Sequence, residues 1–212
     1  MSLKPFQHLD AVAVPIAQSN VDTDQIVPAR YLQKPRSDDF GKYLFRDLRF
    51  RPDGSEVPEF VLNQPPYRDG RIVVAERNFG CGSSREHAVW ALYDYGFQAV
   101  IAPSFGDIFS SNALKNGLLP VVLPEEAVAA MLEAIQAAPG SRICVDLAGQ
   151  TVVAPDGTSY SFDIGPFAKH CLLNGLDELD YTLSLVDHIA EFERRLEPVS
   201  YTHLTLPTTP YV

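Results

Sequence analysis

Arg71-Ile-Val-Val-Ala75 leads into Asn78-Phe-Gly-Cys-Gly-Ser-Ser-Arg-Glu-His87 and then into Ala88-Val-Trp-Ala-Leu-Tyr93. The first run favours a strand and the last a helix, so glycines, two serines and an arginine lie where a strand passes into a helix. A helix start offers unpaired backbone N–H groups and the positive end of its dipole, and both attract anions. Arg85 adds a guanidinium that can hold a carboxylate or phosphate through two parallel hydrogen bonds. The stretch predicts an α/β fold with an anion-binding turn.

The same alternation continues toward the C-terminus. We expect strands at 72–76, 98–102 and 119–123 and helices at 84–95, 107–115 and 125–137, an order that favours parallel pairing through crossover helices. The remaining elements expected are a strand at 9–16, a cap or turn at Asp22, antiparallel strands at 142–148, 150–154 and 158–163, and helices at 166–173 and 185–196.

Two segments depart from this pattern. Residues 31–70 are rich in charged residues, Pro and Gly, with isolated aromatics, and predict a long loop region with short elements. Long ordered loops tend to carry function. Residues 199–212 contain no Asp, Glu, Lys or Arg and are crowded with Thr and Pro. They predict a non-native or disordered tail after a single domain over residues 1–198.

The composition indicates a globular, acidic protein. The chain has 212 residues, of which 46% are hydrophobic and 21% charged, enough for one sizeable core. Its formal net charge of −10 argues against nucleic acid or an anionic membrane as the main partner. The apolar runs are shorter than the roughly 20 residues of a membrane span. The first eight residues lack the apolar core of a signal peptide, so we expect the protein in the cytoplasm.

The three cysteines do not suggest a metal site or a disulfide framework. Cys81, Cys144 and Cys171 are far apart, odd in number and without a C-x-x-C spacing. A self-contained zinc or iron–sulfur site is therefore not expected on this chain. For Cys144 and Cys171 we expect the ordinary role of small buried residues.

The serine-rich turn also permits a purely structural explanation. Ser83-x-x-Glu86 matches a capping box, in which Ser83 caps the helix and Glu86 bonds back to it. The capping box does not explain the doubled serine, the adjacent Arg85 or the spacing Gly80-x-Gly82. That glycine spacing lets another molecule approach the backbone closely. Capping and anion binding are compatible, because both use the start of a helix.

Other chemistries fit the turn less well. A hydrolase with Ser83 or Cys81 as nucleophile and His87 as base lacks an evident third orienting residue. The glycine pattern matches neither a P-loop nor a full dinucleotide fingerprint. Asp24 gains a role only if the fold brings its carboxylate to the turn, where it can orient a serine hydroxyl; the sequence alone leaves this open.

Asn78–Ala88 resembles the signature of the swivelling domain of the aconitase superfamily. The resemblance extends through Asn20-Val-Asp-Thr-Asp-Gln-Ile-Val-Pro28, Val100-Ile-Ala-Pro-Ser-Phe105, Asn116-Gly-Leu-Leu-Pro120 and His170-Cys-Leu-Leu-Asn-Gly-Leu-Asp177, and it covers about residues 5–197. Over this length the chain is similar to the small-subunit family of the bacterial 3-isopropylmalate dehydratases. The resemblance implies one swivelling β/β/α domain, a mixed sheet with flanking helices.

The resemblance also implies a partner and a reaction. A large subunit would carry a [4Fe–4S] cluster, this chain would hold no metal or cofactor, and only the docked pair would be active. The implied reaction isomerises 2-isopropylmalate to 3-isopropylmalate through 2-isopropylmaleate in leucine biosynthesis. Related hydro-lyases acting on citramalate, homocitrate (the homoaconitate reaction) or dimethylmalate, and a non-catalytic carboxylate-binding regulator, are the alternatives. The loop from about Tyr31 to Arg36 occupies the position associated with reading the substrate's third substituent.

The family roles fall on five residues of this sequence. Ser83 resembles the catalytic base, which as an alkoxide removes a proton from the carbon next to a carboxylate. Ser84 and Arg85 resemble ligands of the substrate carboxylate. Asp24 and Thr23 match a second active-site segment, in which Asp24 is expected to orient Ser83 or its partners and Thr23 to help bind the substrate.

Overall fold

The structure, a computed structural model, describes residues 3–36 and 40–195. The chain divides into two units, Met1–Asp177 and Glu178–Val212. The first contains all the strands of the described residues, and the second contains helices α7 (Glu178–Ser184) and α8 (Val186–Arg195). The tail predicted at 199–212 lies outside the described residues, as do the last residues of the domain expected over 1–198.

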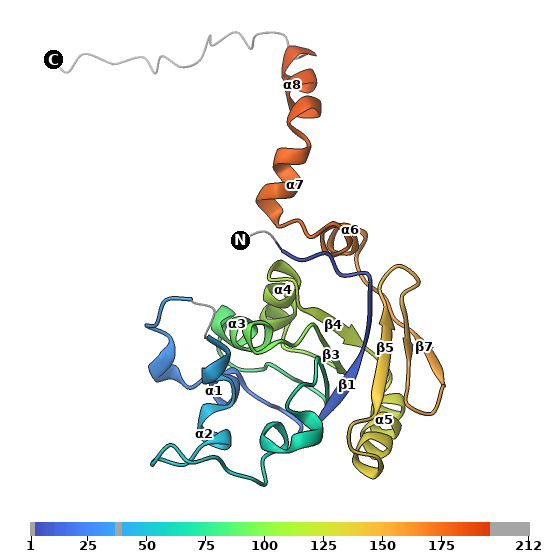
Figure 1. Cartoon of the computed structure of the whole chain (residues 1–212). Helices are drawn as coiled ribbons and strands as arrows, with labels where there is room; N and C mark the ends of the chain where they lie inside the picture. The colour runs from blue at the N-terminus through green and yellow to red at the C-terminus, as the bar shows by residue number, and fades with distance from the viewer. Residues whose placement is uncertain (1–2, 37–39, 196–212) are drawn as a thin grey trace, which may run out of the picture. The chain divides into compact units, whose positions relative to one another are not determined.

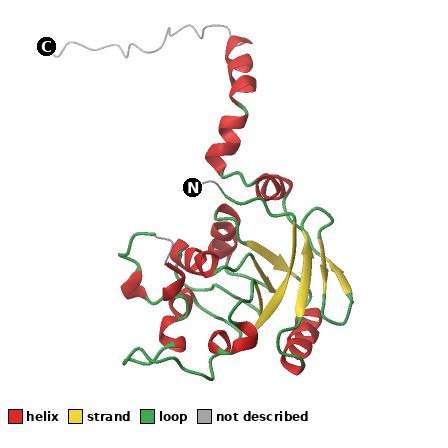
Figure 2. Ribbon diagram, viewed as in Figure 1, coloured by secondary structure: helices red, strands yellow, loops and turns green. Residues whose placement is uncertain are grey.

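The first unit is built on a seven-stranded mixed sheet with the order β4-β3-β2-β1-β5-β6-β7 (Figure 2). Strands β1 to β4 pair in parallel, whereas β5 runs antiparallel to β1 and continues into an antiparallel β5-β6-β7 meander. Every residue of β2 and β3 is buried, as expected for parallel strands covered on both faces. The bounds are β1 (His8–Ile16), β2 (Ile72–Ala75), β3 (Ala99–Ala102), β4 (Leu119–Val122), β5 (Arg142–Asp146), β6 (Thr151–Val153) and β7 (Ser159–Ser161). The expected mixed α/β sheet is confirmed.

Helices cover the sheet as crossover connections require. Helix α3 (Glu86–Tyr95) joins β2 to β3 and α4 (Asp107–Lys115) joins β3 to β4, while α5 (Glu125–Ala137) packs on β1, β2 and β3. Figure 1 shows α5 on the other side of the sheet from α3 and α4. The predicted bounds of α4 and α5 are confirmed. Helix α6 (Pro166–Asn174) ends the first unit, and no helix of the described residues is both long and apolar enough to cross a membrane.

The long segment between β1 and β2 packs as part of the core. Its aromatic and leucine side chains at Phe40, Leu44, Phe45 and Leu62 are almost completely buried. A Cβ on Gly41 would lie 2.5 Å from the backbone nitrogen of Tyr95, so the segment packs closely on α3. Its elements are α1 (Thr23–Ile26), η1 (Ala29–Tyr31), η2 (Phe40–Tyr43), α2 (Arg46–Arg49), η3 (Val61–Asn63) and η4 (Pro65–Tyr67), where η denotes a 3₁₀ helix. The prediction of short elements in this region is confirmed.

Two local predictions need correction. The helix expected at 185–196 corresponds to α8, but α7 precedes it and was not predicted. Cys171 is buried as expected, whereas Cys144 is only partly buried. Its Sγ lies 3.0 Å from Nε2 of His8, because Cys144 and His8 are diagonal neighbours on the paired strands β5 and β1.

Candidate active site

The serine-rich turn is held at the carboxyl ends of three parallel strands. Pairing between the strands continues beyond them as isolated bridges, Asp22 with Cys81 and Phe79 with Phe105. The backbone N–H of Gly80 donates to Val21 O at 2.7 Å, and the N–H of Phe79 donates to Ser104 O at 3.1 Å. The loops after β1, β2 and β3 are therefore joined like an extension of the sheet. Ligands of open α/β sheets bind at this edge.

Glycine is required where these loops meet. Gly80 has φ +71°, and a Cβ added there would lie 2.2 Å from Cγ of Phe109 on α4. A Cβ on Gly106 would lie 2.5 Å from the carbonyl oxygen of Gly80. Gly82 has φ +88° and more space around it, since the nearest atom is the Cβ of Asp22 at 3.5 Å. The glycines thus allow two loops and a helix to meet directly beneath the serines.

Thr23 positions the turn through its side chain. Its hydroxyl donates to the backbone carbonyl of Ser83 at 2.8 Å, and its own N–H donates to Cys81 O at 3.0 Å. Thr23 is 2% exposed, whereas Ser83 and Ser84 are exposed. The predicted site residue Thr23 is brought to the turn, but its donor is used within the protein. The two serine hydroxyls are the groups open to a ligand.

Asp24 contacts Arg85 and not Ser83. Its carboxylate forms an ion pair with Nη1 of Arg85, which lowers the pKa of Asp24 from its ordinary value, with desolvation opposing the shift. The Arg85 side chain is 13% exposed and that of Asp24 is 54% exposed. Only Nη1 of the guanidinium is used by a described residue, so Nη2 and Nε remain for a second carboxylate. Asp24 therefore holds the guanidinium of Arg85 and does not orient Ser83 directly.

The helix after the turn begins later than expected, and the capping box at Ser83 is wrong. The N-cap of α3 is Arg85, which makes no side-chain capping hydrogen bond. Glu86 instead accepts a hydrogen bond from the amide of Asn116 at 2.8 Å. A capping box does form at α1, where Asp22 and Gln25 bond reciprocally, as expected of Asp22 as a cap. The start of α3 thus retains backbone donors beside Arg85.

His87 belongs to an aromatic cluster and not to a nucleophile–base pair. Its ring centroid lies 4.4 Å from that of Trp90 and 5.8 Å from that of Phe40. No hydrogen bond joins His87 to Ser83 or Cys81, all of which are described. The geometry therefore gives no support to a hydrolase arrangement at this turn.

The turn opens into a small cavity of about 170 Å³. Serines, glycines and Arg85 form one side of it, and the loop and first turn leading into α4 form the other. Its lining residues are Thr23, Gly80, Gly82, Ser83, Ser84, Arg85, Gly106, Asp107, Ile108 and Phe109. A cavity of this size admits part of a small acid, so a complete site needs a further wall.

Sequence reasoning missed the side chain that anchors α3 to its surroundings. Asn116 is 7% exposed; its amide oxygen accepts from Arg36 and from Trp90 Nε1, each at 3.0 Å. Arg36 also forms an ion pair with Asp94 at 3.2 Å. The sequence marked Asn116 only within a motif of the resemblance and directly after the helix expected over 107–115, and its spacing to Arg36 carries no local signal. The end of the loop assigned to substrate reading is therefore fixed to α3 and α4.

The described residues contain no group of three or more His, Cys, Asp or Glu that could hold a metal ion. Cys81 lies in the turn, but Cys144 and Cys171 lie on β5 and α6. An iron–sulfur cluster thus finds no set of ligands on this part of the chain.

Comparison with known proteins gives a consistent family. The model for the aconitase C-terminal domain matches residues 3–126, and the model LeuD_N matches residues 129–166. The 3-isopropylmalate dehydratase small subunit of Cereibacter sphaeroides (strain KD131) is 50% identical over 194 residues, 92% of this chain and 96% of that protein. That of Paramagnetospirillum magneticum is 51% identical over 191 residues, covering 90% and 95%.

A solved structure agrees with the sequence relatives. The crystal structure of 3-isopropylmalate dehydratase (leuD) from Methanocaldococcus jannaschii has a TM-score of 0.63 and 25% identity. The similarity covers 88% of this chain and 99% of that one. Sequence and fold therefore point to the same relatives.

Proposed function

Because the chain belongs to the family of 3-isopropylmalate dehydratase small subunits, we propose that it is one half of a hydro-lyase of leucine biosynthesis. The pair would isomerise 2-isopropylmalate to 3-isopropylmalate through 2-isopropylmaleate, in the cytoplasm. At the site, the proposed function is supported by one observation: two exposed serines and Arg85 lie together at the start of α3. Such a site can hold a carboxylate and exchange a proton next to it.

We propose that Arg85, Ser84 and the backbone at the start of α3 bind a substrate carboxylate. The Nη2 and Nε donors of Arg85 suit a bidentate contact, while Asp24 on Nη1 limits the rotation of the guanidinium. Ser84 is exposed beside it and can donate a further hydrogen bond. The chain's net charge of −10 makes this local cation necessary for an anionic substrate.

We propose that Ser83 is the base that removes the proton from the carbon next to the bound carboxylate. An ordinary serine hydroxyl is too weakly acidic for this role, so its alkoxide needs stabilising donors. The start of α3 and the Arg85 guanidinium supply a positive environment in the adjoining residues. Thr23 fixes the Ser83 backbone through its 2.8 Å hydrogen bond, which makes Thr23 a positioning residue.

The proposal includes a large subunit as partner. Loss of the hydroxyl requires a Lewis acid, which a [4Fe–4S] cluster on that partner would supply when bound. The residues that the structure describes offer no ligand set for such a cluster. Ser83, Ser84 and Arg85 would bind the acid and handle its proton, while Thr23 would hold the turn that carries them.

The test is turnover by the reconstituted pair with Ser83→Ala. We expect turnover to fall by at least about 10²-fold, the usual range of a lost acid–base group, while assembly with the large subunit is unchanged. Ser159→Ala is the matched control, because Ser159 is an exposed serine on β7. Near-normal turnover in Ser83→Ala would refute the base assignment.

Assays of the pair with citramalate, homocitrate and dimethylmalate distinguish the related hydro-lyases from one another. A non-catalytic regulator would instead bind its ligand without the partner.

A further inference from the structure

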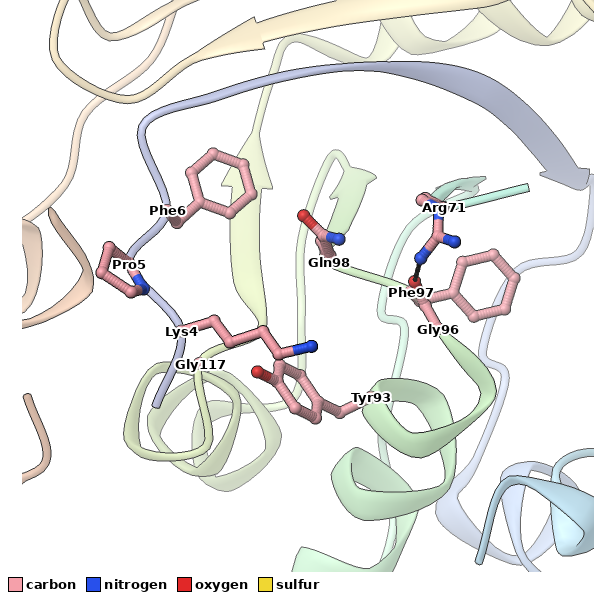
Figure 3. A pocket seen from close by; sticks show the side chains of 9 residues that line it. All are labelled: Lys4, Pro5, Phe6, Arg71, Tyr93, Gly96, Phe97, Gln98 and Gly117. Carbon is pink, nitrogen blue, oxygen red and sulfur yellow. Dashed lines mark hydrogen bonds between the residues drawn. The ribbon is translucent and has the colours of Figure 1, made fainter. Parts of the chain in front are cut away.

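A second cavity lies at the other end of the parallel strands from the serine turn. Arg71 and Gln98 directly precede β2 and β3, and therefore stand at the amino ends of these strands. Tyr93 comes from the last turn of α3, and Lys4 extends toward it from the segment before β1 (Figure 3). The cavity measures about 240 Å³, slightly below the usual range of drug-sized sites, and suits a small metabolite.

Four polar side chains converge on this cavity. They are the ammonium of Lys4, the guanidinium of Arg71, the hydroxyl of Tyr93 and the amide of Gln98. Within the described residues, the only hydrogen bond from these groups is a long one of 3.5 Å, from Arg71 Nη1 to Gly96 O. The remaining donors are thus open to a ligand. A few convergent polar groups in a concave site are the usual form of a small-molecule site.

The charge and the apolar walls define the ligand. The lining holds two cations and no carboxylate, on a chain whose formal net charge is −10. Phe6, which is 6% exposed, contributes an apolar wall together with the ring of the half-buried Tyr93. A carboxylate can pair with the cations while an apolar chain covers the aromatic walls. A purely apolar or a cationic ligand lacks one of these contacts.

The backbone next to Lys4, an exposed residue, is anchored to α6. The N–H of Phe6 donates to Leu172 O of α6 at 2.8 Å, which fixes the segment that carries Lys4. Cations near helix ends often serve only to offset the helix dipole. That explains the contact of Arg71 with Gly96. In the last turn of α3, the carbonyls of Leu92 and Tyr93 already accept the N–H groups of Gly96 and Phe97. Lys4 has no such partner among the described residues.

We propose that this cavity binds a small monocarboxylic acid with a short apolar chain. Its carboxylate lies between Lys4 and Arg71, a hydroxyl or other polar substituent contacts the Tyr93 hydroxyl or Gln98, and its chain packs on Phe6 and the Tyr93 ring. The site is separate from the serine turn, and the inference does not depend on the proposed function.

The test is a titration of the full chain, without a partner, with 2-hydroxypentanoate at fixed ionic strength. We expect saturable shifts of the Gly96, Gln98 and Gly117 amide signals with a Kd of about 1 mM or tighter. Lys4→Gln and Arg71→Gln should each weaken binding about tenfold, since a charged hydrogen bond is lost. Arg51→Gln is the control, because it removes an exposed cation that does not line the cavity.

The neutral amide of the same acid separates charge from apolar contact. It should bind at least about tenfold more weakly than the acid. The proposal is overturned if the acid gives no saturable shift, if acid and amide bind equally, or if Arg51→Gln weakens binding as much as Lys4→Gln. Proper folding of each variant is checked by the unchanged signals of the sheet residues.

Discussion

Gly80→Ala tests whether the loops beneath the serine turn are as closely packed as the structure indicates. Gly80 has φ +71°, a conformation that costs a residue with a Cβ about 1–2 kcal/mol. The new Cβ would also lie 2.2 Å from Phe109 Cγ and 2.7 Å from Phe109 Cβ. Carbon atoms in contact prefer about 3.5–4.0 Å, so the ring or the loop has to move by more than 1 Å.

Phe109 has little freedom to move. It is 3% exposed, and its ring packs on Phe79 with centroids 5.4 Å apart and on Phe105 with centroids 6.1 Å apart. Overpacking of such a site costs about 1–3 kcal/mol. Together with the backbone conformation, Gly80→Ala should lower the free energy of unfolding by about 2–5 kcal/mol.

Gly157→Ala provides the matched control. Gly157 lies in the β6–β7 hairpin with φ +87°, and a Cβ there meets nothing within 4 Å. It carries the cost of the backbone conformation without the clash, and the entropy change of the unfolded chain is the same for both variants. Urea unfolding should therefore show Gly80→Ala as the less stable by about 1–3 kcal/mol. Equal stability of the two variants would refute the packing argument.

A double variant identifies the clashing partner. Phe109→Ala alone removes a buried ring and should cost about 3–5 kcal/mol. If Gly80→Ala acts through that ring, the losses in free energy of unfolding are not additive. The double variant should then lose about 1–3 kcal/mol less than the sum of the two single losses. Additive costs would place the strain elsewhere.

Three further predictions concern the site and the tail. Thr23→Val keeps the shape but leaves the Ser83 carbonyl without its donor, and should destabilise the protein by about 1–3 kcal/mol in urea unfolding and lower kcat more than it changes KM. Asp24→Asn should cost at most about 1 kcal/mol near pH 7, because the Asp24 side chain is 54% exposed and solvent screens its ion pair. Since Arg85 lowers the pKa of Asp24 below 3.8, this difference should persist above about pH 4 and vanish as the pH falls through the lowered pKa; a difference independent of pH contradicts the pairing. Deletion of 199–212 should leave Tm and turnover unchanged, and a loss of either would show that the tail belongs to the fold.

The sequence predicted elements well wherever the signal was local. Helices α4 and α5 have the expected bounds, because apolar spacing and residues such as Asn116-Gly117 mark them directly. The same local signal failed at Ser83-x-x-Glu86. There the hydroxyl of Thr23 binds the Ser83 carbonyl and Asn116 binds Glu86, so tertiary contacts replace the capping box.

The candidate site residues were identified by their motifs, but their contacts were not predicted. Asp24 and Arg85 are 61 positions apart, and Arg36 and Asn116 are 80 apart, so no periodicity links them. From the sequence alone, a role for Asp24 depended on the fold bringing it to the turn. The sequence also did not show whether its partner there would be Ser83 or Arg85. The fold brings Asp24 to the turn, because α1 follows β1 and the turn follows β2, its parallel neighbour, and the ion pair there is with Arg85.

The hydrogen-bonded extension of the sheet under the serine turn has a consequence for assembly. Cys81, Phe79 and Gly80 are paired by backbone contacts within this one chain. If the turn binds the acid as proposed, the backbone beneath it is already paired before a second subunit arrives, and association does not have to order that part. Binding energy that would otherwise offset lost loop entropy remains available for holding the two subunits together.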